Sequence, residues 1–235
     1  MSGHAETVLI LSAFNFAQAT QCLSSVFHYL KKQHDYSVQL EDDISSLLFN
    51  DEVNDFIATQ IDTQHKNINE IQKEHPWLRL EGLVAIGEVV DYAETYLYPL
   101  DREYKKCSIS ISLGAAFYDA VYEEDEFDNE ARRALIRFCL GVVNAAQSEG
   151  FVLVFDDEPQ KPFSRINSVQ LRHYLLESTT EELRQEPKLI IGIQNNLVLK
   201  EEIEAIWGKG ENIVETTNGY IVFDIILPDE GDEEE

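Results

Sequence analysis

Residues 108–113 have the sequence Ser-Ile-Ser-Ile-Ser-Leu, the clearest two-residue alternation in the chain. Successive side chains of a β-strand point to opposite faces of its sheet. The isoleucines are therefore predicted to face a core, and the serines to face outward or across a sheet. A strand of this kind needs partners on either side, so we looked for them outward along the chain.

Further strands are predicted where apolar and β-branched residues cluster or alternate. Their ranges are 7–11, 37–40, 77–81, 151–155, 188–193, 212–217 and 220–227. The last two flank Asn218-Gly219, a pair that readily adopts positive φ and suits a two-residue type I′ hairpin.

Helices are predicted where apolar residues recur at spacings of three and four. Their ranges are 16–32 after a cap at Asn15, 53–71 after a cap at Asp51, 130–146, a short segment after Ser168, and 200–207. Residues 82–100 fit either a strand pair or a strand followed by a helix that ends at Pro99, and we favour the latter.

These elements together predict an α+β fold with a mixed or largely antiparallel sheet flanked by helices and a C-terminal β-hairpin. We expect one domain over residues 1–228, because no Pro/Gly/Ser-rich linker or internal repeat divides the chain. Residues 229–235 hold six acidic residues after Pro228, and we expect a short disordered acidic tail there.

The 235 residues carry 18 Lys and Arg against 44 Asp and Glu, a formal net charge of −26. Both parts of the chain are acidic, with −10 over residues 1–120 and −16 over the remainder. Phosphate backbones and anionic membranes repel such a chain, so we expect it to bind neither nucleic acid nor membranes. The same charge would speed association with a basic partner.

Three cysteines, Cys22, Cys107 and Cys139, lie far apart in apolar surroundings and form no CxxC pair. They are predicted to be buried thiols and not disulfides, metal ligands or nucleophiles. The N-terminal residues lack the basic region of a signal peptide, and no apolar run is long enough to span a membrane. We therefore expect a cytoplasmic location.

The sequence contains no recognisable catalytic or cofactor motif. The glycines fit neither GxGxxG nor GxxxxGK[ST], and there is no GxSxG or HExxH. Gly208-Lys209-Gly210 is interpreted as a helix stop and not as a phosphate loop. The six histidines form no metal pattern, and His28 and His34, at one helix end, are given surface or capping roles. We expect no metal, no cofactor and no enzymatic activity.

One carboxylate group keeps an enzymatic alternative open. Asp156-Asp157-Glu158 directly follows the buried strand predicted over residues 151–155, the place where sites on open α/β sheets commonly lie. The spacing matches no calcium loop. A divalent metal held there, with a catalytic site assembled from scattered residues, is the hypothesis that would make this chain an enzyme.

The middle of the chain is rich in tyrosine and acid. Tyrosines at 92, 96, 98, 104, 118 and 122 are interleaved with carboxylates. Tyrosine is enriched at protein interfaces, where it supplies rigid contact area with a polar tip. Candidate partner-binding residues are Tyr118, Tyr122, Glu123, Glu124, Asp125, Glu126 and Asp128. Core packing is the alternative for each tyrosine.

Size, charge and the lack of catalytic motifs favour an acidic protein-binding inhibitor of a basic partner. The most specific form of this hypothesis is an immunity protein, of the kind found in toxin–antitoxin pairs, that neutralises a toxin such as a nuclease. Carboxylates would then occupy a cleft built for phosphates. A scaffold or adaptor protein is the alternative, and the sequence leaves the choice between monomer and homodimer open.

Overall fold

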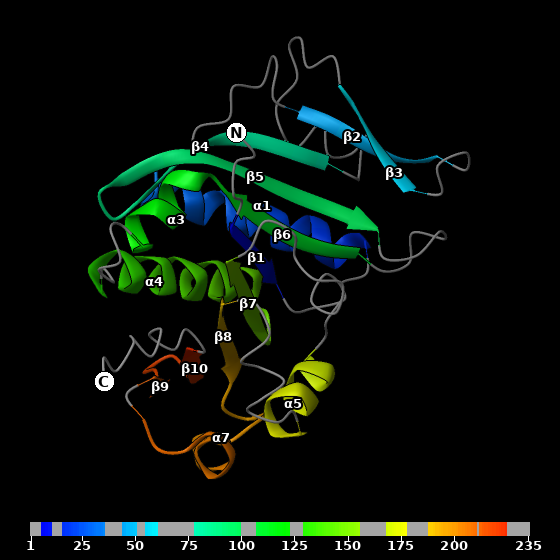
Figure 1. Cartoon of the computed structure of the whole chain (residues 1–235). Helices are drawn as coiled ribbons and strands as arrows, with labels where there is room; N and C mark the ends of the chain where they lie inside the picture. Colours follow the sequence, from blue (N-terminus) through cyan, green and yellow to red (C-terminus); the bar gives the residue numbers. More distant parts are fainter. Residues whose placement is uncertain are drawn as a thin grey trace, which may run out of the picture.

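The computed structural model describes residues 6–10, 16–35, 44–50, 55–60, 78–99, 107–122, 129–155, 168–177, 188–210 and 212–224. Within these ranges ten strands form one sheet in the order β3-β2-β4-β5-β6-β1-β7-β8-β10-β9. Every adjacent pair is antiparallel. The fold is α+β, as predicted, and its sheet is antiparallel throughout the described strands (Figure 1).

The strands are β1 Glu6–Ile10, β2 Ile44–Asn50, β3 Asp55–Gln60, β4 Leu78–Ile86, β5 Val89–Pro99, β6 Cys107–Leu113, β7 Gly150–Phe155, β8 Lys188–Gln194, β9 Ile213–Glu215 and β10 Tyr220–Asp224. The helices are α1 Phe16–Gln33, α3 Ala115–Tyr122, α4 Asn129–Ala146, α5 Ser168–Glu177 and α7 Lys200–Trp207. Strand β1 lies in the middle, with Val8 opposite Ile111 of β6 on one side and Leu153 of β7 on the other.

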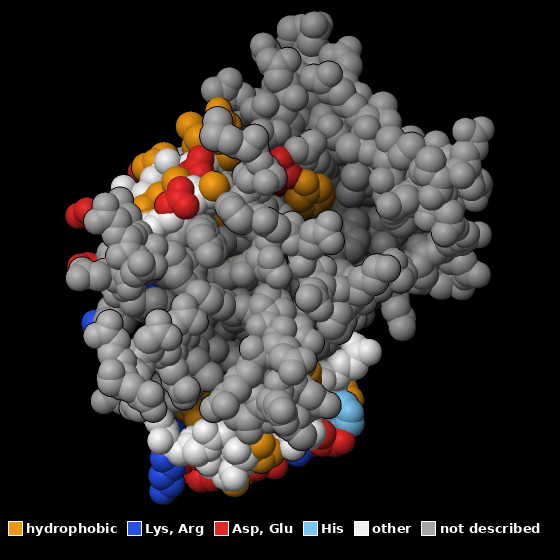
Figure 2. All heavy atoms as spheres, in the orientation of Figure 1, with side chains coloured by type: hydrophobic (Ala, Val, Ile, Leu, Met, Phe, Trp, Pro, Cys, Tyr) orange, Lys and Arg blue, Asp and Glu red, His pale blue; other side chains and the backbone are white. Residues whose placement is uncertain are grey.

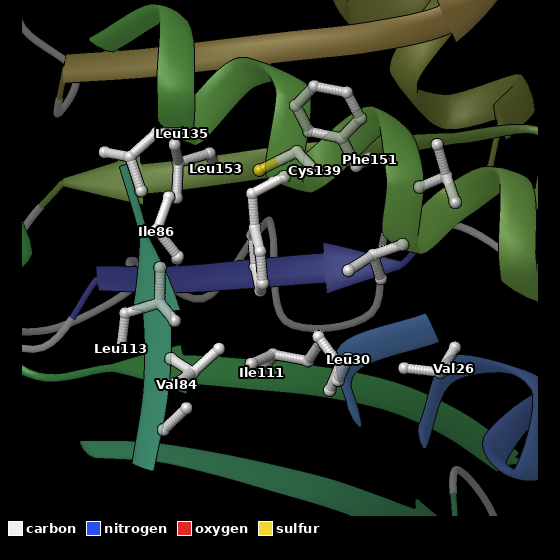
Figure 3. Packing of buried hydrophobic residues seen from close by; sticks show 14 of the residues in the cluster. Val26, Leu30, Val84, Ile86, Ile111, Leu113, Leu135, Cys139, Phe151 and Leu153 are labelled. Carbon is white, nitrogen blue, oxygen red and sulfur yellow. The ribbon is translucent and has the colours of Figure 1, made fainter. Parts of the chain in front are cut away.

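One face of the sheet packs against α1 and α4. The alternation in residues 108–113 sends Ile109, Ile111 and Leu113 into this core, as predicted. Val26 and Leu30 enter it from α1, and Leu135 and Cys139 enter it from α4 (Figure 3). The apolar stripes of the two helices therefore bury the same face, which leaves their opposite sides outside the sheet.

A second core covers the other face at the C-terminal end of the sheet, beneath α5 and α7. Strand β7 contributes Phe151 and Leu153 to the first core and Val152 to the second. Strand β10 divides in the same way, with Tyr220 and Val222 on one side and Ile221 and Phe223 on the other. Burial on both faces explains why these strands are continuously apolar.

Two predicted helices are wrong. Residues 55–60, placed in a helix over 53–71, form β3, which pairs with β2 so that Phe49 meets Phe56 and Leu48 meets Ile57. The remainder of 53–71 lies outside the described residues. Residues 89–99 form β5 and not a helix before Pro99. In both segments an apolar partner strand outweighs the helical spacing.

A glycine turn explains the second error. Ile86 pairs with Val89, so Gly87-Glu88 forms a two-residue loop with Gly87 at φ 63°. Positive φ at the first central position is the requirement of a type II′ hairpin turn. The strand pair that we weighed for residues 82–100 is therefore the correct alternative.

The C-terminal hairpin is confirmed, but its turn differs from the predicted type I′. Thr216 and Tyr220 exchange backbone and hydroxyl hydrogen bonds around a three-residue loop. Only Gly219 in that loop takes positive φ, at 78°, which corresponds to a type I turn followed by a glycine bulge. Helix α3 was not predicted. The strand predicted over 37–40 and the acidic tail lie outside the described residues.

Candidate functional site

The predicted partner-binding residues are divided between α3 and the chain segment that follows it. Tyr118 and Tyr122 lie on α3, and the acidic residues Glu123 to Asp128 lie outside the described residues, between α3 and α4. Figure 1 shows α3 and the start of α4 near the hairpin turn. A Cβ on Gly87 would come 3.2 Å from the Cβ of Ala134, which confirms this proximity.

Helix α3 is tied to β5 through Asp91. The Asp91 carboxylate accepts a hydrogen bond from the Ala116 amide at 3.1 Å, and the Gly114 amide donates to the Tyr92 carbonyl at 2.8 Å. A Cβ on Gly114 would overlap the Asp91 carboxylate. Asp91, which the sequence placed in the tyrosine-and-acid section, therefore caps a helix. Residues 118 and 122 consequently lie on a helix that is anchored to the sheet.

An exposed apolar surface lies on the hairpin itself. Leu83, Val90 and Tyr92 are 39%, 63% and 58% exposed, and we call these three residues the β4–β5 face. Leu83 and Tyr92 are directly opposite each other across the two strands. Their side of the sheet is opposite the core that contains Val84 and Ala93. Figure 2 shows apolar and acidic side chains together at the upper left, over this hairpin.

Acidic residues come next in register on the same side. Glu81 lies opposite Glu94, two positions along the strands from the Leu83–Tyr92 pair. The Tyr96 hydroxyl donates a hydrogen bond to the Glu94 carboxylate. In the register, two glutamate positions therefore follow the exposed apolar residues on this side of the sheet.

A second feature lies between the C-terminal end of α1, the start of α4 and the hairpin turn. His34 Nδ1 lies 2.7 Å from the Ala85 carbonyl oxygen, and His34 Nε2 lies 2.9 Å from the Tyr29 hydroxyl. A carbonyl can only accept, so Nδ1 carries the proton and Nε2 accepts from Tyr29. The Ala85 amide also donates to the His34 carbonyl at 2.9 Å. His34 thus fastens the end of α1 to β4.

The two side chains of this pair have displaced pKa values. Burial lowers the pKa of His34, opposed in part by its hydrogen bond to the Ala85 backbone and by the charge of Asp35. Burial, with Cys139 as a second cause, raises the pKa of Tyr29 to about 12. Both groups are therefore neutral at physiological pH, with a single defined direction of hydrogen bonding.

A cavity of about 280 Å³ opens beside this pair, between Tyr29, His34, Gly87 and Arg137. A broader hollow of about 520 Å³ continues along α1, lined by Ser24, Ser25, His28 and Lys32 and sharing Tyr29 with the cavity. Among the described residues, no acidic side chain lines either space. Sequence reasoning gave His34 a capping role and missed the cavity, since residues 29, 87 and 137 are far apart in the chain.

The helices that form these hollows are the exception to the acidity of the chain. Helix α1 contains two lysines and no acid, and α4 contains three arginines and one acid, Glu130. The pair therefore carries a net charge of +4 within a chain of −26. The sequence signal that could have revealed this surface is the absence of any Asp or Glu over residues 16–33.

Neither metal ligands nor redox groups mark a site in the described part of the chain. No cluster of three or more His, Cys, Asp or Glu residues suited to a metal occurs among the described residues. Cys139 is a buried thiol outside any disulfide. Cys22 is a half-buried thiol whose pKa is raised by burial and whose Sγ donates to the Ala146 carbonyl at 3.1 Å. Asp156–Glu158 lies outside the described ranges. None of the described helices is long and apolar enough to cross a membrane.

The chain was compared with family models, with curated proteins and with solved structures, and none of the three comparisons finds a match.

Proposed function

We propose that this protein is a cytoplasmic, non-enzymatic inhibitor that binds a basic protein partner, in the manner of an immunity protein that neutralises a toxin such as a nuclease. The observation that carries the proposal is the β4–β5 face, where Leu83, Val90 and Tyr92 are solvent-exposed next to the Glu81–Glu94 pair. An apolar centre with a polar, charged rim is the usual anatomy of a protein–protein interface.

Exposed apolar groups on a sheet need a reason when they occur together. Single exposed apolar residues are normal, whereas a contiguous group marks a binding surface. Three side chains that adjoin across two strands form such a group, and Tyr92 is the kind of residue that contributes most to binding energy when a partner buries it. Burial of Tyr92 at the centre of a complex would therefore stabilise the complex mainly by slowing its dissociation.

The acidic rim defines the chemistry of the partner. Glutamate positions beside the apolar residues favour arginine and lysine on the opposing protein, and the net charge of −26 steers such a partner toward the complex. In the proposal, Tyr118 and Tyr122 on α3 and the acidic residues Glu123, Glu124, Asp125, Glu126 and Asp128 that follow them in the sequence also contact the partner. A nuclease, whose cleft attracts phosphates, is the partner class that such carboxylates would block.

The test is affinity capture from native lysate with the purified full chain, washed at low and then at high salt, followed by identification and recombinant production of the retained protein. Tyr92→Ala is compared with Val169→Ala, a control at an apolar residue that is 75% exposed on α5. Tyr92→Ala should speed dissociation of the recombinant partner at least about tenfold, as expected for truncation of a central tyrosine. Val169→Ala should leave the dissociation rate unchanged.

Charge reversal provides the second arm. Replacing Glu123, Glu124 and Glu126 by lysine should slow association and flatten its dependence on salt, because rim charges act mainly on the encounter rate. No stoichiometric basic partner at any salt concentration, or equal effects of Tyr92→Ala and Val169→Ala, would refute the proposal. A mass in solution that falls from dimer to monomer on Tyr92→Ala would instead assign this face to self-association in a scaffold.

A further inference from the structure

The cavity beside Tyr29 and His34 has features that the proposed inhibitor function does not use. It lies between the end of α1, the start of α4 and the hairpin turn at Gly87, on the side of the sheet that the two helices cover, whereas the β4–β5 face lies on the other side. No residue that lines it belongs to the proposed partner-binding set. Its charged lining residue is an arginine, although the chain as a whole carries −26.

We propose that the cavity between Tyr29, His34, Gly87 and Arg137 is a binding site for a small molecule that carries a carboxylate or phosphate group. Arg137 would hold the oxyanion, and the remainder of the ligand would extend along the polar hollow beside Ser24, Ser25 and His28. The inference is independent of the partner-binding proposal and stands or falls on different residues.

Arg137 is the anchor of this site. Its side chain is exposed at the cavity, and in the part of the chain that the structure describes no carboxylate forms an ion pair with it. By contrast, Arg132 on the same helix is bound to Asp224. A guanidinium offers two parallel N–H donors that match the oxygens of a carboxylate or phosphate. The chain has 44 acidic residues that could pair with an arginine, so an arginine beside a cavity without an ion pair to any described carboxylate is unexpected.

The wall opposite Arg137 is held rigidly before any ligand arrives. Tyr29 is seated against Gly141 of α4 so closely that a Cβ at residue 141 would overlap the tyrosine hydroxyl. The hydroxyl is fixed on His34, which is fixed in turn on the Ala85 carbonyl. Preorganised polar groups bind a ligand without an additional ordering cost. The Gln33 amide on the same rim supplies a further donor.

The net charge of the protein does not prevent anion binding here. Charges farther away than about 8 Å are largely screened at physiological ionic strength. The charges beside the cavity are mixed: Arg137 lines it, whereas Asp35 follows His34 and Glu88 follows Gly87, both at exposed positions. Direct pairing with the Arg137 guanidinium therefore has to hold a small anion, whereas an extended polyanion would also meet the distant acidic surface. This difference restricts the ligand to a small molecule.

The experiment is isothermal titration calorimetry of the full chain with inorganic phosphate and, separately, with succinate, at low ionic strength and about pH 7.5, where an imidazole of lowered pKa is neutral. One saturable site per chain is expected. Saturation with phosphate alone identifies phosphate compounds as the ligand class, and saturation with succinate alone identifies carboxylates. The proposal is overturned if neither gives saturable binding up to about 20 mM, where even a millimolar site would be filled.

Matched arginine variants test the location. Arg137→Gln should weaken binding at least about tenfold, because it removes a charge-assisted bidentate pair. Arg133→Gln removes the same charge from an exposed residue on the same helix that lines neither hollow, and it should change the affinity less than about twofold because its field is screened. Equal weakening by both variants would show diffuse attraction and would refute the site.

A third variant tests the rigid wall. Tyr29→Phe keeps the ring against Gly141 and removes only the hydroxyl that bonds to His34. It should weaken phosphate or succinate binding by a smaller factor than Arg137→Gln, and circular dichroism should show an unchanged fold. If Tyr29→Phe and Arg137→Gln both leave the affinity unchanged in a folded protein, binding takes place elsewhere and the assignment is wrong.

Discussion

Replacing Gly141 by alanine is the sharpest test of how α1 and α4 fit together. In the interior of an ordinary helix this change stabilises the folded state by about 1 kcal/mol, because alanine has the higher helix propensity. In this protein the new Cβ would overlap the hydroxyl and the adjoining ring carbons of Tyr29. Either Tyr29 must rotate out of its seat or the two helices must separate.

The magnitude follows from the contacts that are lost. Displacement of Tyr29 breaks its hydrogen bond to His34, which contributes about 0.5–1.5 kcal/mol to stability. Overpacking of a closely fitted interior costs about 1–3 kcal/mol. After subtraction of the gain in helix propensity, the free energy of unfolding should fall by about 0.5–3.5 kcal/mol. For a chain of this length, each kcal/mol corresponds to a fall in Tm of about 2–4 °C.

Urea unfolding followed by circular dichroism measures the effect, and a double-mutant cycle isolates its cause. In a Tyr29→Ala background the ring is absent, so Gly141→Ala should regain its ordinary stabilising effect of up to about 1 kcal/mol. Asn144→Ala, at an exposed position on the same helix, is the control for helix propensity and should stabilise both backgrounds equally. The sign of the Gly141→Ala effect should therefore depend on residue 29.

An increase in stability on Gly141→Ala in the otherwise unchanged chain would refute this reasoning. It would mean that Tyr29 does not occupy the space beside residue 141 in solution. The proposed anion site would lose its rigid wall as well, although the anchoring role of Arg137 would remain testable by itself. Equal destabilisation in both backgrounds would point to a neighbour other than Tyr29.

Three further changes test other contacts. Burial lowers the pKa of His34, so as the pH is lowered the unfolded state takes up a proton on this residue before the folded state does. The contribution of neutral His34 to stability should therefore be complete above about pH 6.5 and decline as the pH falls below that value. The urea midpoint should depend less strongly on pH in His34→Gln than in the unchanged chain. Arg132→Met leaves the nearly buried Asp224 without its ion-pair partner and should cost about 3–5 kcal/mol, with part of the loss recovered on adding Asp224→Asn. Gly219→Ala places a Cβ at φ 78° and should lower the free energy of unfolding by about 1 kcal/mol or more, measured in the same way.

Most of the sheet could be predicted because its strands carry their signals locally. Alternation over residues 108–113 placed Ile109 and Ile111 in the core, and Asn218-Gly219 located the last hairpin. The strands over 55–60 and 89–99 were missed for a common reason. Short segments whose apolar spacing fits a helix become strands when a neighbouring strand offers apolar partners, and pairing of that kind is a property of the fold.

The candidate sites were harder to predict than the strands. Exposure of Val90 and Tyr92 follows from the register of β5, so it could not be inferred while that segment was expected to be a helix. The cavity needs Tyr29, Gly87 and Arg137 to come together from two helices and a turn. No short stretch of sequence shows that these three residues are neighbours. The net charge of −26 is a sum over the whole chain, so it does not show that α1 and α4 are basic.

That distribution is itself an argument about function. Among the α1 residues whose side chains are described, eight are exposed, and all are neutral or basic: Gln18, Gln21, Ser24, Ser25, His28, Lys31, Lys32 and Gln33. If acidic residues served solubility alone, an exposed helix would be a natural place for them, since net charge acts on solubility from any position. With +4 on α1 and α4, the other 199 residues carry −30. Such segregation is expected of a protein that presents carboxylates to one ligand and cations to another, so solubility is an insufficient explanation of its charge.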